Sequence, residues 1–299
     1  MKKIVCLILA LMMLFTLCAC GAKEAPAPAA PAANEPGAQP GGTMEEKPVE
    51  VERVPDLKVP DDALKIKFIM GIDPEYAPFS YMGDDGEYTG FDVEVCRAAC
   101  EKLGWDFEVF GVNWDQKLVQ LDAKECDCVW SGMTIMPEMY DNYVISEPYY
   151  DSVQVLLVKS DSGYTGYADL AGKDVAVQLG TSGESLLNGD LADIAATFNK
   201  VVTCDSFLKC FTELDGGAVD AVFVDLPVAA SYAAEHEGFT VLNENLGFEQ
   251  YGIAFRAGDQ ALCDAIQGAV NELVADGTYA EIAAKEEYAE IVDNLSFLK

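Results

Sequence analysis

The segment that decides the fold runs from Gly90 to Leu103 and has the sequence GFDVEVCRAACEKL. From Val93 onward its apolar residues recur at helical spacing, which predicts a helix with one buried face. Gly90 permits a turn before this helix. Asp92 is expected to cap it, because a carboxylate accepts hydrogen bonds from the free N–H groups of a first turn. The segment therefore predicts an amphipathic helix that packs on the rest of a folded domain.

On both sides of this helix, predicted strands and helices alternate in two series that break near residues 150–154. Such alternation predicts two α/β lobes with mostly parallel sheets. The last strand and helices have no partners of their own, so we expect them to return to the first lobe. Ligands of open α/β sheets bind at the carboxyl ends of strands, so the cleft between the lobes is the expected site. The expected strands are 65–71, 106–110, 126–130, 153–159, 175–178, 201–204, 221–225, 240–242 and 252–255, with a hairpin at 81–89. The other expected helices are 114–121, one beginning after 180–183, 207–214, 227–234, 261–275 and 278–285.

The first 60 residues differ in composition from the rest. A basic start is followed by an apolar run of 16 residues, Ile4 to Ala19, which suits a signal peptide and is short for a membrane-spanning helix. The run leads into LCAC at 17–20, which resembles the bacterial lipobox; an ordinary cleaved signal is the alternative. Residues 21–60 contain eight of the 13 prolines and no periodicity. We expect a lipoprotein signal peptide at 1–20, lipidation at Cys20, and a disordered Pro/Ala/Glu-rich linker at 21–60.

Charge and composition exclude several classes of function. The chain has 19 Lys and Arg against 51 Asp and Glu, a net charge of −32, which argues against nucleic-acid binding because phosphate contacts need cations. The single His, His236, argues against a His-paired nucleophile and a His-rich metal site. Seven cysteines follow the signal segment without zinc-ribbon spacing. We expect buried, unpaired thiols, with one structural disulfide as the alternative, and no metal.

Six further segments join the Gly90 helix in resembling one family, the bacterial family 3 extracellular solute-binding proteins, which are amino-acid-binding components of ABC importers. The resemblance covers about residues 61–290, in the order of the family. It implies an α/β type II periplasmic-binding-protein fold, in which two lobes joined by a two-strand hinge close on a ligand. We expect lobe 1 at 61–152 plus 250–299 and lobe 2 at 153–249. The segments are DPEYAPF (73–79), SGMTI (131–135), SEPYY (146–150), VAVQLGTSG (175–183), DAVFVD (220–225) and DGTY (276–279).

The resemblance also implies a ligand site in the cleft. Asp225 matches the acid that pairs with the α-ammonium of the ligand, and a carboxylate accepts such charge-assisted hydrogen bonds well. Its alternative role is to cap the helix that follows. Asp73 matches a position that contacts a polar side chain or amine of the ligand, with a turn before Pro74 as the alternative. Tyr76 and Trp114 match two aromatic residues that sandwich the ligand side chain, with core packing as the alternative.

Backbone and hydroxyl groups are the expected partners of a ligand carboxylate. Thr181 and Ser182 lie where a helix is predicted to begin, and free N–H groups there bind anions. Plain helix capping by Thr181 is the alternative, and the two roles are compatible. The expected contacts with the carboxylate are Ser131, Gly132, Thr134, Thr181 and Ser182, and Gln178 is a further expected ligand contact.

The sequence departs from the family pattern at Met139. Five residues after the position of Thr134, the family usually has an Arg that clamps the ligand carboxylate with two hydrogen bonds, and a bidentate Arg is not readily replaced. We expect none of the three arginines in the cleft, namely Arg53, Arg97 and Arg256. Either hydroxyl and helix N–H groups hold the carboxylate alone, or the ligand lacks an α-carboxylate.

Together these features predict a substrate-binding lipoprotein of an ABC importer, which captures a polar or cationic amino acid and delivers it to a permease. A binding protein for an amine or other cation is the main alternative. A dehydratase for cyclic acids is more remote, because its substrates call for cationic clamps; a sensor domain for a separate receptor is a further possibility. We expect no catalytic residues and no cofactor. We expect a monomer anchored through Cys20 at the cell surface or in the periplasm.

Overall fold

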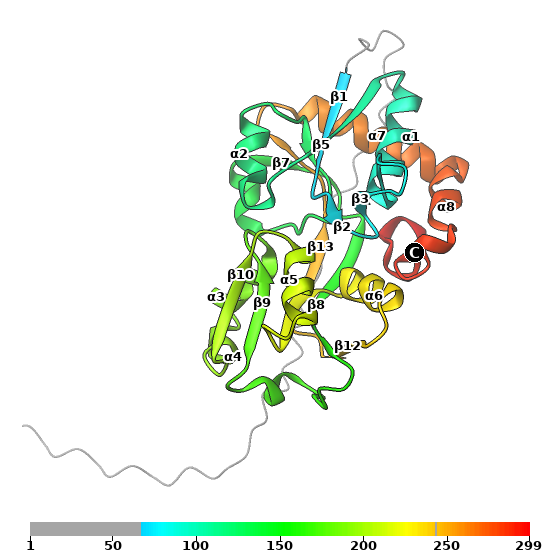
Figure 1. Cartoon of the computed structure of the whole chain (residues 1–299). Coiled ribbons are helices and arrows are strands. Elements are labelled where there is room, and N and C mark those ends of the chain that lie inside the picture. The colour runs from blue at the N-terminus through cyan, green and yellow to red at the C-terminus, as the bar shows by residue number, and fades with distance from the viewer. Residues whose placement is uncertain (1–66, 243) are drawn as a thin grey trace, which may run out of the picture. The chain divides into compact units, whose positions relative to one another are not determined.

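The structure is a computed structural model that describes residues 67–242 and 244–299 (Figure 1). All of them belong to one compact unit of the chain, Met44–Lys299. The predicted signal peptide, its lipidation site Cys20 and the predicted linker lie outside the described residues. No helix in the described part of the chain has the length and apolar character needed to cross a membrane.

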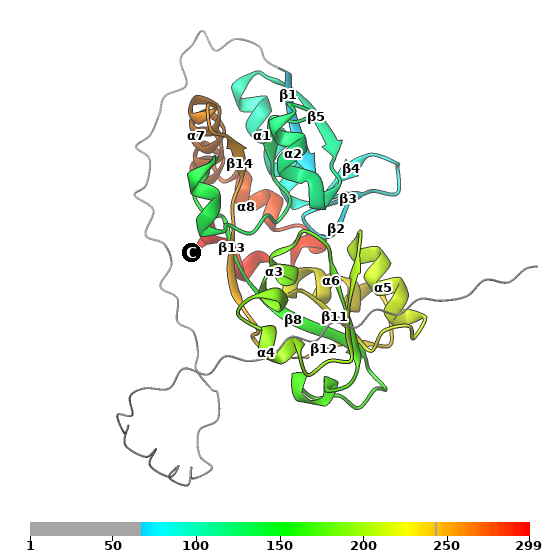
Figure 2. The ribbon, with the colours of Figure 1, turned by 90° about the vertical axis from the view of Figure 1, so that its left-hand side faces the viewer.

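The first sheet has five strands in the order β5-β1-β6-β14-β7. The neighbours β5, β1 and β6 are parallel, whereas β14 is antiparallel to both β6 and β7. Helices α1 (Phe91–Leu103) and α7 (Gln260–Asp276) pack against each other beside this sheet, as Figures 1 and 2 show. The strands are β1 (Lys67–Ile72), β5 (Asp106–Gly111), β6 (Cys128–Val129), β7 (Tyr143–Ile145) and β14 (Ala254–Arg256).

The second sheet has the path β10-β9-β11-β8-β12, and β13 also pairs with β8. Its centre is parallel, while β8 runs antiparallel to its neighbours. The strands are β8 (Tyr150–Lys159), β9 (Asp174–Gln178), β10 (Lys200–Cys204), β11 (Ala221–Asp225), β12 (Phe239–Leu242) and β13 (Phe248–Tyr251). The helices that follow its strands are α3 (Ser182–Asn188), α4 (Ala192–Ala195), α5 (Phe207–Asp215) and α6 (Leu226–Glu235).

Two neighbouring strands connect the sheets. The start of β8, from Tyr150 to Val153, pairs with β13, and its remainder pairs with β11 and β12. After β13 the chain returns to the first sheet through β14. The two crossing segments therefore form one antiparallel ribbon, visible in Figure 1 where green β8 lies beside orange β13. This ribbon agrees with the two-strand hinge that the resemblance implies.

The smaller elements complete the first lobe. A three-stranded sheet contains β2 (Glu75–Tyr76), β3 (Ser80–Met82) and β4 (Tyr88–Thr89), and the short helices are α2 (Lys117–Asp122) and α8 (Thr278–Ala283). The strands and helices expected from the sequence are present with small differences at their ends. The strands β7 and β13 were not expected, because each is only three or four residues long.

The start of α1 corrects one expectation. Gly90, at φ 119°, occupies the N-cap position, and a Cβ there would lie 2.4 Å from the carbonyl oxygen of Phe79. Asp92 is not the cap: it lies within the first turn, and its side chain points inward. Its Oδ2 accepts hydrogen bonds from Gly132 N (2.8 Å) and Tyr149 OH (2.6 Å). Distant partners therefore outcompete the local N–H groups for this carboxylate.

All seven cysteines that follow residue 90 are buried and free. Their burial agrees with the expectation that they act as small apolar side chains. Most belong to the main hydrophobic core, and Cys126 packs in a smaller cluster with Trp114 and Met139.

Candidate functional site

A pocket of about 170 Å³ opens between groups from the two lobes. Its walls on the first-lobe side come from β2, from residues 114–118 at the start of α2, and from the segment after β6. On the second-lobe side they come from the start of α3 and the end of β11. Of the ten expected ligand contacts, the seven that line this pocket are Tyr76, Trp114, Gly132, Thr134, Thr181, Ser182 and Asp225. The remaining three, Asp73, Ser131 and Gln178, lie behind the wall.

Asp225 supplies a buried acid at one end of the pocket. It ends β11 and occupies the N-cap position of α6, but its side chain makes no capping bond. Its Oδ1 instead accepts a hydrogen bond of 2.5 Å from Gln154 Nε2. The same amide nitrogen also donates to Glu249 Oε1 at 3.1 Å. Burial, and then the charge of Glu249, hold the pKa of Asp225 well above its ordinary value.

Glu249 is a second buried acid, which sequence reasoning missed. It lies in β13 and is 6% exposed. Its Oε2 accepts hydrogen bonds from Thr134 Oγ1 (2.8 Å) and Ser182 Oγ (2.9 Å), two of the hydroxyls expected to bind a ligand carboxylate. Within residues 67–242 and 244–299, no ion pair joins Asp225 or Glu249 to a cation.

Lys117 brings a cation to another part of the pocket wall. Its Nζ lies 4.6 Å from the centre of the Trp114 ring and donates to the carbonyl oxygens of Trp114 (3.2 Å) and Gly180 (2.6 Å). Burial lowers the pKa of Lys117 to about 8. Sequence reasoning searched only for Arg in the cleft. The signal that could have found Lys117 is its position three residues after Trp114, one turn along a helical segment.

Tyr76 serves both the pocket and the core. Its ring centre lies 5.8 Å from that of Phe79 and 5.9 Å from that of Phe207, and its OH is 2.8 Å from the OH of Tyr251. Gly132 fits against it, since a Cβ at Gly132 would lie 2.2 Å from Tyr76 Cε1, and the φ of Gly132 is 53°. Core packing, the alternative for Tyr76, therefore coexists with its place in the wall.

Direct hydrogen bonds join the two sides of the cleft. Gln178 Nε2 donates to Asp73 Oδ2 at 2.7 Å, and Lys117 reaches the carbonyl of Gly180. The other oxygen of Asp73 accepts from the N–H of Glu75 at 2.9 Å, so the predicted turn role is also present. Burial is the main reason that the pKa of Asp73 is raised. Asp73 and Gln178 thus hold the two lobes together behind the pocket wall.

The hydroxyls of Ser131 and Thr181 have partners within the protein. Ser131 Oγ lies 2.5 Å from Ser80 Oγ and accepts from the N–H of Asp73 at 3.0 Å. Thr181 Oγ1 accepts from the N–H of Glu184 at 3.1 Å, which is the predicted capping bond at the start of α3. Thr181 lines the pocket and Ser131 lies behind its wall, and contacts of either residue with a ligand stay predictions.

The family model for bacterial extracellular solute-binding proteins, family 3, matches residues 68–286, which is most of the described chain. The chain belongs to this family. Arginine-binding protein 1 of an ABC transporter from Escherichia coli is 30% identical over 226 residues, which cover 74% of this chain and 90% of the relative. L-cystine-binding protein TcyJ of Escherichia coli is 33% identical over 220 residues, which cover 73% and 81%.

A solved structure shows the same fold. The substrate-binding protein of an ABC uptake transporter from Streptococcus pneumoniae, crystallised with bound histidine, has a TM-score of 0.70 and 25% identity, with 73% of this chain and 90% of that chain covered. Together with the two sheets and the ribbon between them, this likeness confirms the type II periplasmic-binding-protein fold expected from the sequence.

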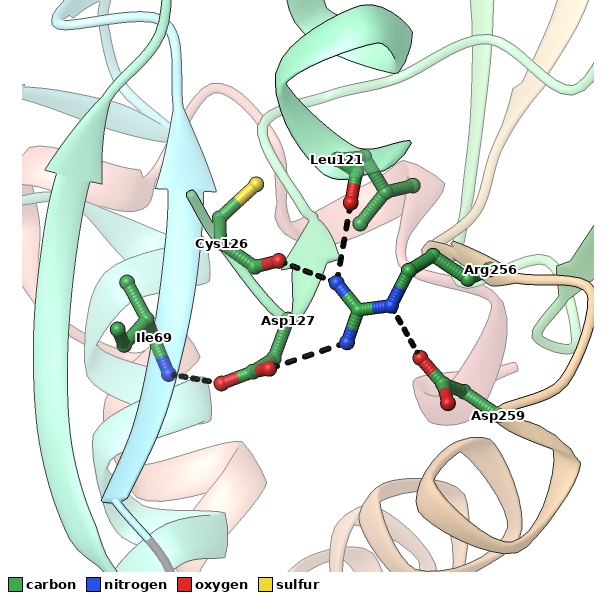
Figure 3. A network of polar contacts seen from close by, with 6 residues as sticks. All are labelled: Ile69, Leu121, Cys126, Asp127, Arg256 and Asp259. Carbon is green, nitrogen blue, oxygen red and sulfur yellow. Dashed lines mark hydrogen bonds and ion pairs between the residues drawn. The ribbon is translucent and has the colours of Figure 1, made fainter. Parts of the chain in front are cut away.

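This family 3 protein has no Arg in the wall of its described pocket. Met139, which the resemblance places at the position of the expected carboxylate-binding Arg, lines the pocket. Arg97 lies with its guanidinium carbon 4.9 Å from the centre of the Phe107 ring. Arg256 is bound within the first lobe (Figure 3), and Arg53 lies outside the described residues. The partners of Arg256 are the carbonyls of Leu121 and Cys126 and the carboxylates of Asp127 and Asp259.

Proposed function

We propose that this chain is the solute-binding component of an ABC importer, which captures a small molecule with a cationic nitrogen in the pocket and delivers it to a permease. The observation that carries this proposal is the pair of buried acids, Asp225 and Glu249, which lack a cationic partner among the described residues. Burying carboxylates without a cation is costly. A ligand ammonium would supply the missing charge, and Tyr76 and Trp114 would cover its apolar part.

The relatives support a nitrogenous solute. They are named for arginine and cystine, and the structural neighbour contains histidine. An amino acid with a polar or cationic side chain is the candidate expected from the family. An amine is the second candidate, favoured by Met139 in the wall. A dehydratase for cyclic acids has less support. Its substrates carry carboxylates that need a cationic side chain, and the position expected to supply one is occupied by Met139.

The cellular setting is part of the same proposal. A lipid group on Cys20 would hold the protein at the outer face of a membrane, with residues 21–60 as its tether. One copy would serve as the receptor, because the pocket draws its walls from both lobes of one chain. We place lobe 1 at 61–152 plus 250–299 and lobe 2 at 153–249, limits that fall within the β8–β13 ribbon.

A ligand screen tests the proposal. The purified protein, unfolded and refolded to remove bound solute, is heated with each of the common amino acids and a set of amines. A ligand at 100 times its Kd adds about 2.7 kcal/mol to the free energy of unfolding, which raises the Tm by roughly 5–10 °C at this chain length. We expect at least one cationic compound to do so. If no compound in either class raises the Tm, the proposed function is wrong.

A further inference from the structure

We infer that Glu249 takes the place of a ligand carboxylate, so that the solute carries no carboxylate on the carbon that bears its ammonium group. The ligand class is then an amine, such as a primary amine, a diamine or an aminoalkylguanidine, rather than an α-amino acid. This inference rests on the proposed function, because it requires that the cleft binds a solute.

The first step concerns hydroxyl protons. Thr134 Oγ1 and Ser182 Oγ both lie within 2.9 Å of Glu249 Oε2. A hydroxyl has a single proton, so a hydroxyl that donates to Glu249 has none left for a second anion. A ligand carboxylate placed beside these groups would meet oxygen lone pairs and the negative charge of Glu249, and both repel it.

The second step concerns the missing clamp. In the family pattern, an acid for the ammonium and an Arg for the carboxylate balance each other. In this chain Met139 stands at the position of that Arg. Arg256 is bonded to Asp127 and Asp259 in the first lobe. Lys117, the cation in the wall, donates to two carbonyl oxygens and covers the face of Trp114. With two of its three N–H donors already bonded, the ammonium of Lys117 cannot form the two parallel hydrogen bonds of an Arg clamp.

The third step is a charge count at the Asp225 end. When ionised, Asp225 and Glu249 carry two negative charges, and they share the donor nitrogen of Gln154 at 2.5 and 3.1 Å. An α-amino acid brings one positive and one negative charge to these two acids and leaves the excess of negative charge unchanged. An amine brings a positive charge alone and reduces the excess. A desolvated site favours the ligand that lowers its net charge.

The test compares solutes that differ by one carboxylate. Isothermal titration of the purified protein at pH 8 measures Kd for arginine against agmatine, lysine against cadaverine, and histidine against histamine. We expect the best-binding amine to bind at least tenfold more tightly than its amino acid. An amino acid that binds as tightly as its amine, or more tightly, overturns the inference while leaving the proposed function in place. If none of these six compounds binds and no compound in the thermal screen raises the Tm, the proposed function itself is wrong.

A matched pair of variants assigns the preference to Glu249. Glu249→Gln removes its charge but keeps an oxygen that accepts from Thr134 and Ser182, and we expect the amine-to-amino-acid ratio to fall at least tenfold. Glu237→Gln removes an exposed charge of the second lobe that lies outside the pocket lining, and the ratio should change less than threefold. Equal changes in both variants would show a general charge effect and refute the role of Glu249. If Glu249→Gln does not fold, Met139→Arg gives a second measure, since the restored clamp should raise amino-acid affinity and lower the ratio.

Discussion

Asp92 and Asp225 are both buried acids near the start of a helix, and they differ in what compensates their charge. Asp92 accepts a backbone N–H from Gly132 and the hydroxyl of Tyr149, both from fixed parts of the first lobe. Asp225 shares one amide hydrogen-bond donor with Glu249 and faces the pocket. The comparison teaches that a buried acid bound by the protein's own donors acts as a structural tie, whereas one that faces a second acid is suited to bind a cation.

The largest effect is expected at Asp225. Asp225→Asn should weaken binding of the best cationic solute by roughly 2–5 kcal/mol, because the ammonium loses a buried charge partner. The fold should remain, since Asn keeps an oxygen for the amide of Gln154. Isothermal titration measures the loss, with Asp190→Asn, an exposed acid of the same lobe, as the control. Unchanged affinity in Asp225→Asn would break the distinction between the two acids.

The next effect is a pH dependence at Asp92. Burial raises its pKa to about 7, against an unfolded value near 3.9. Between these values the folded state binds more protons, so Asp92 lowers stability as pH rises from about 4 to about 7, by as much as about 1.4 kcal/mol per pH unit. Urea unfolding at several pH values should show a flatter profile for Asp92→Asn than for the wild type. Parallel profiles would contradict this assignment.

A somewhat smaller effect separates two replacements of Asp92. Asn keeps an oxygen for Gly132 and Tyr149, whereas Ala leaves their N–H and OH groups buried without an acceptor. Asp92→Ala should therefore be less stable than Asp92→Asn by about 1–3 kcal/mol at the same pH. Chemical unfolding measures this difference. If the two variants are equally stable, the structural role of Asp92 is refuted.

The smallest effect is expected at Tyr149. Tyr149→Phe removes one of the two donors to Asp92 and should cost about 0.5–1.5 kcal/mol of stability. In a protein that already carries Asp92→Ala, Tyr149→Phe should lower the free energy of unfolding by less than it does in the wild type, because the hydrogen bond between the two side chains is already absent. Full additivity in a double-mutant cycle would show that the two residues act independently.

The same comparison shows how far the sequence could predict the molecule. The periodicity of 90–103 and the alternation of strands and helices predict the fold, because these signals lie within short stretches of chain. The partner of Asp92 could not be predicted locally, since Gly132 is 40 residues away. Glu249 was missed because it lies in a four-residue strand, and its contact with Thr134 exists only once the hinge ribbon has formed.

The ribbon made by β8 and β13 also affects how tightly a solute can be held. Because two paired strands tether the lobes, a solute that has bound one lobe meets the other at a high effective concentration, without a second loss of translational freedom. The cross-cleft bonds of Asp73 with Gln178 and of Lys117 with Gly180 then add to closure without any ligand atom. Part of the free energy of closure is therefore supplied by the protein, so that fewer contacts with the solute are needed to close the cleft.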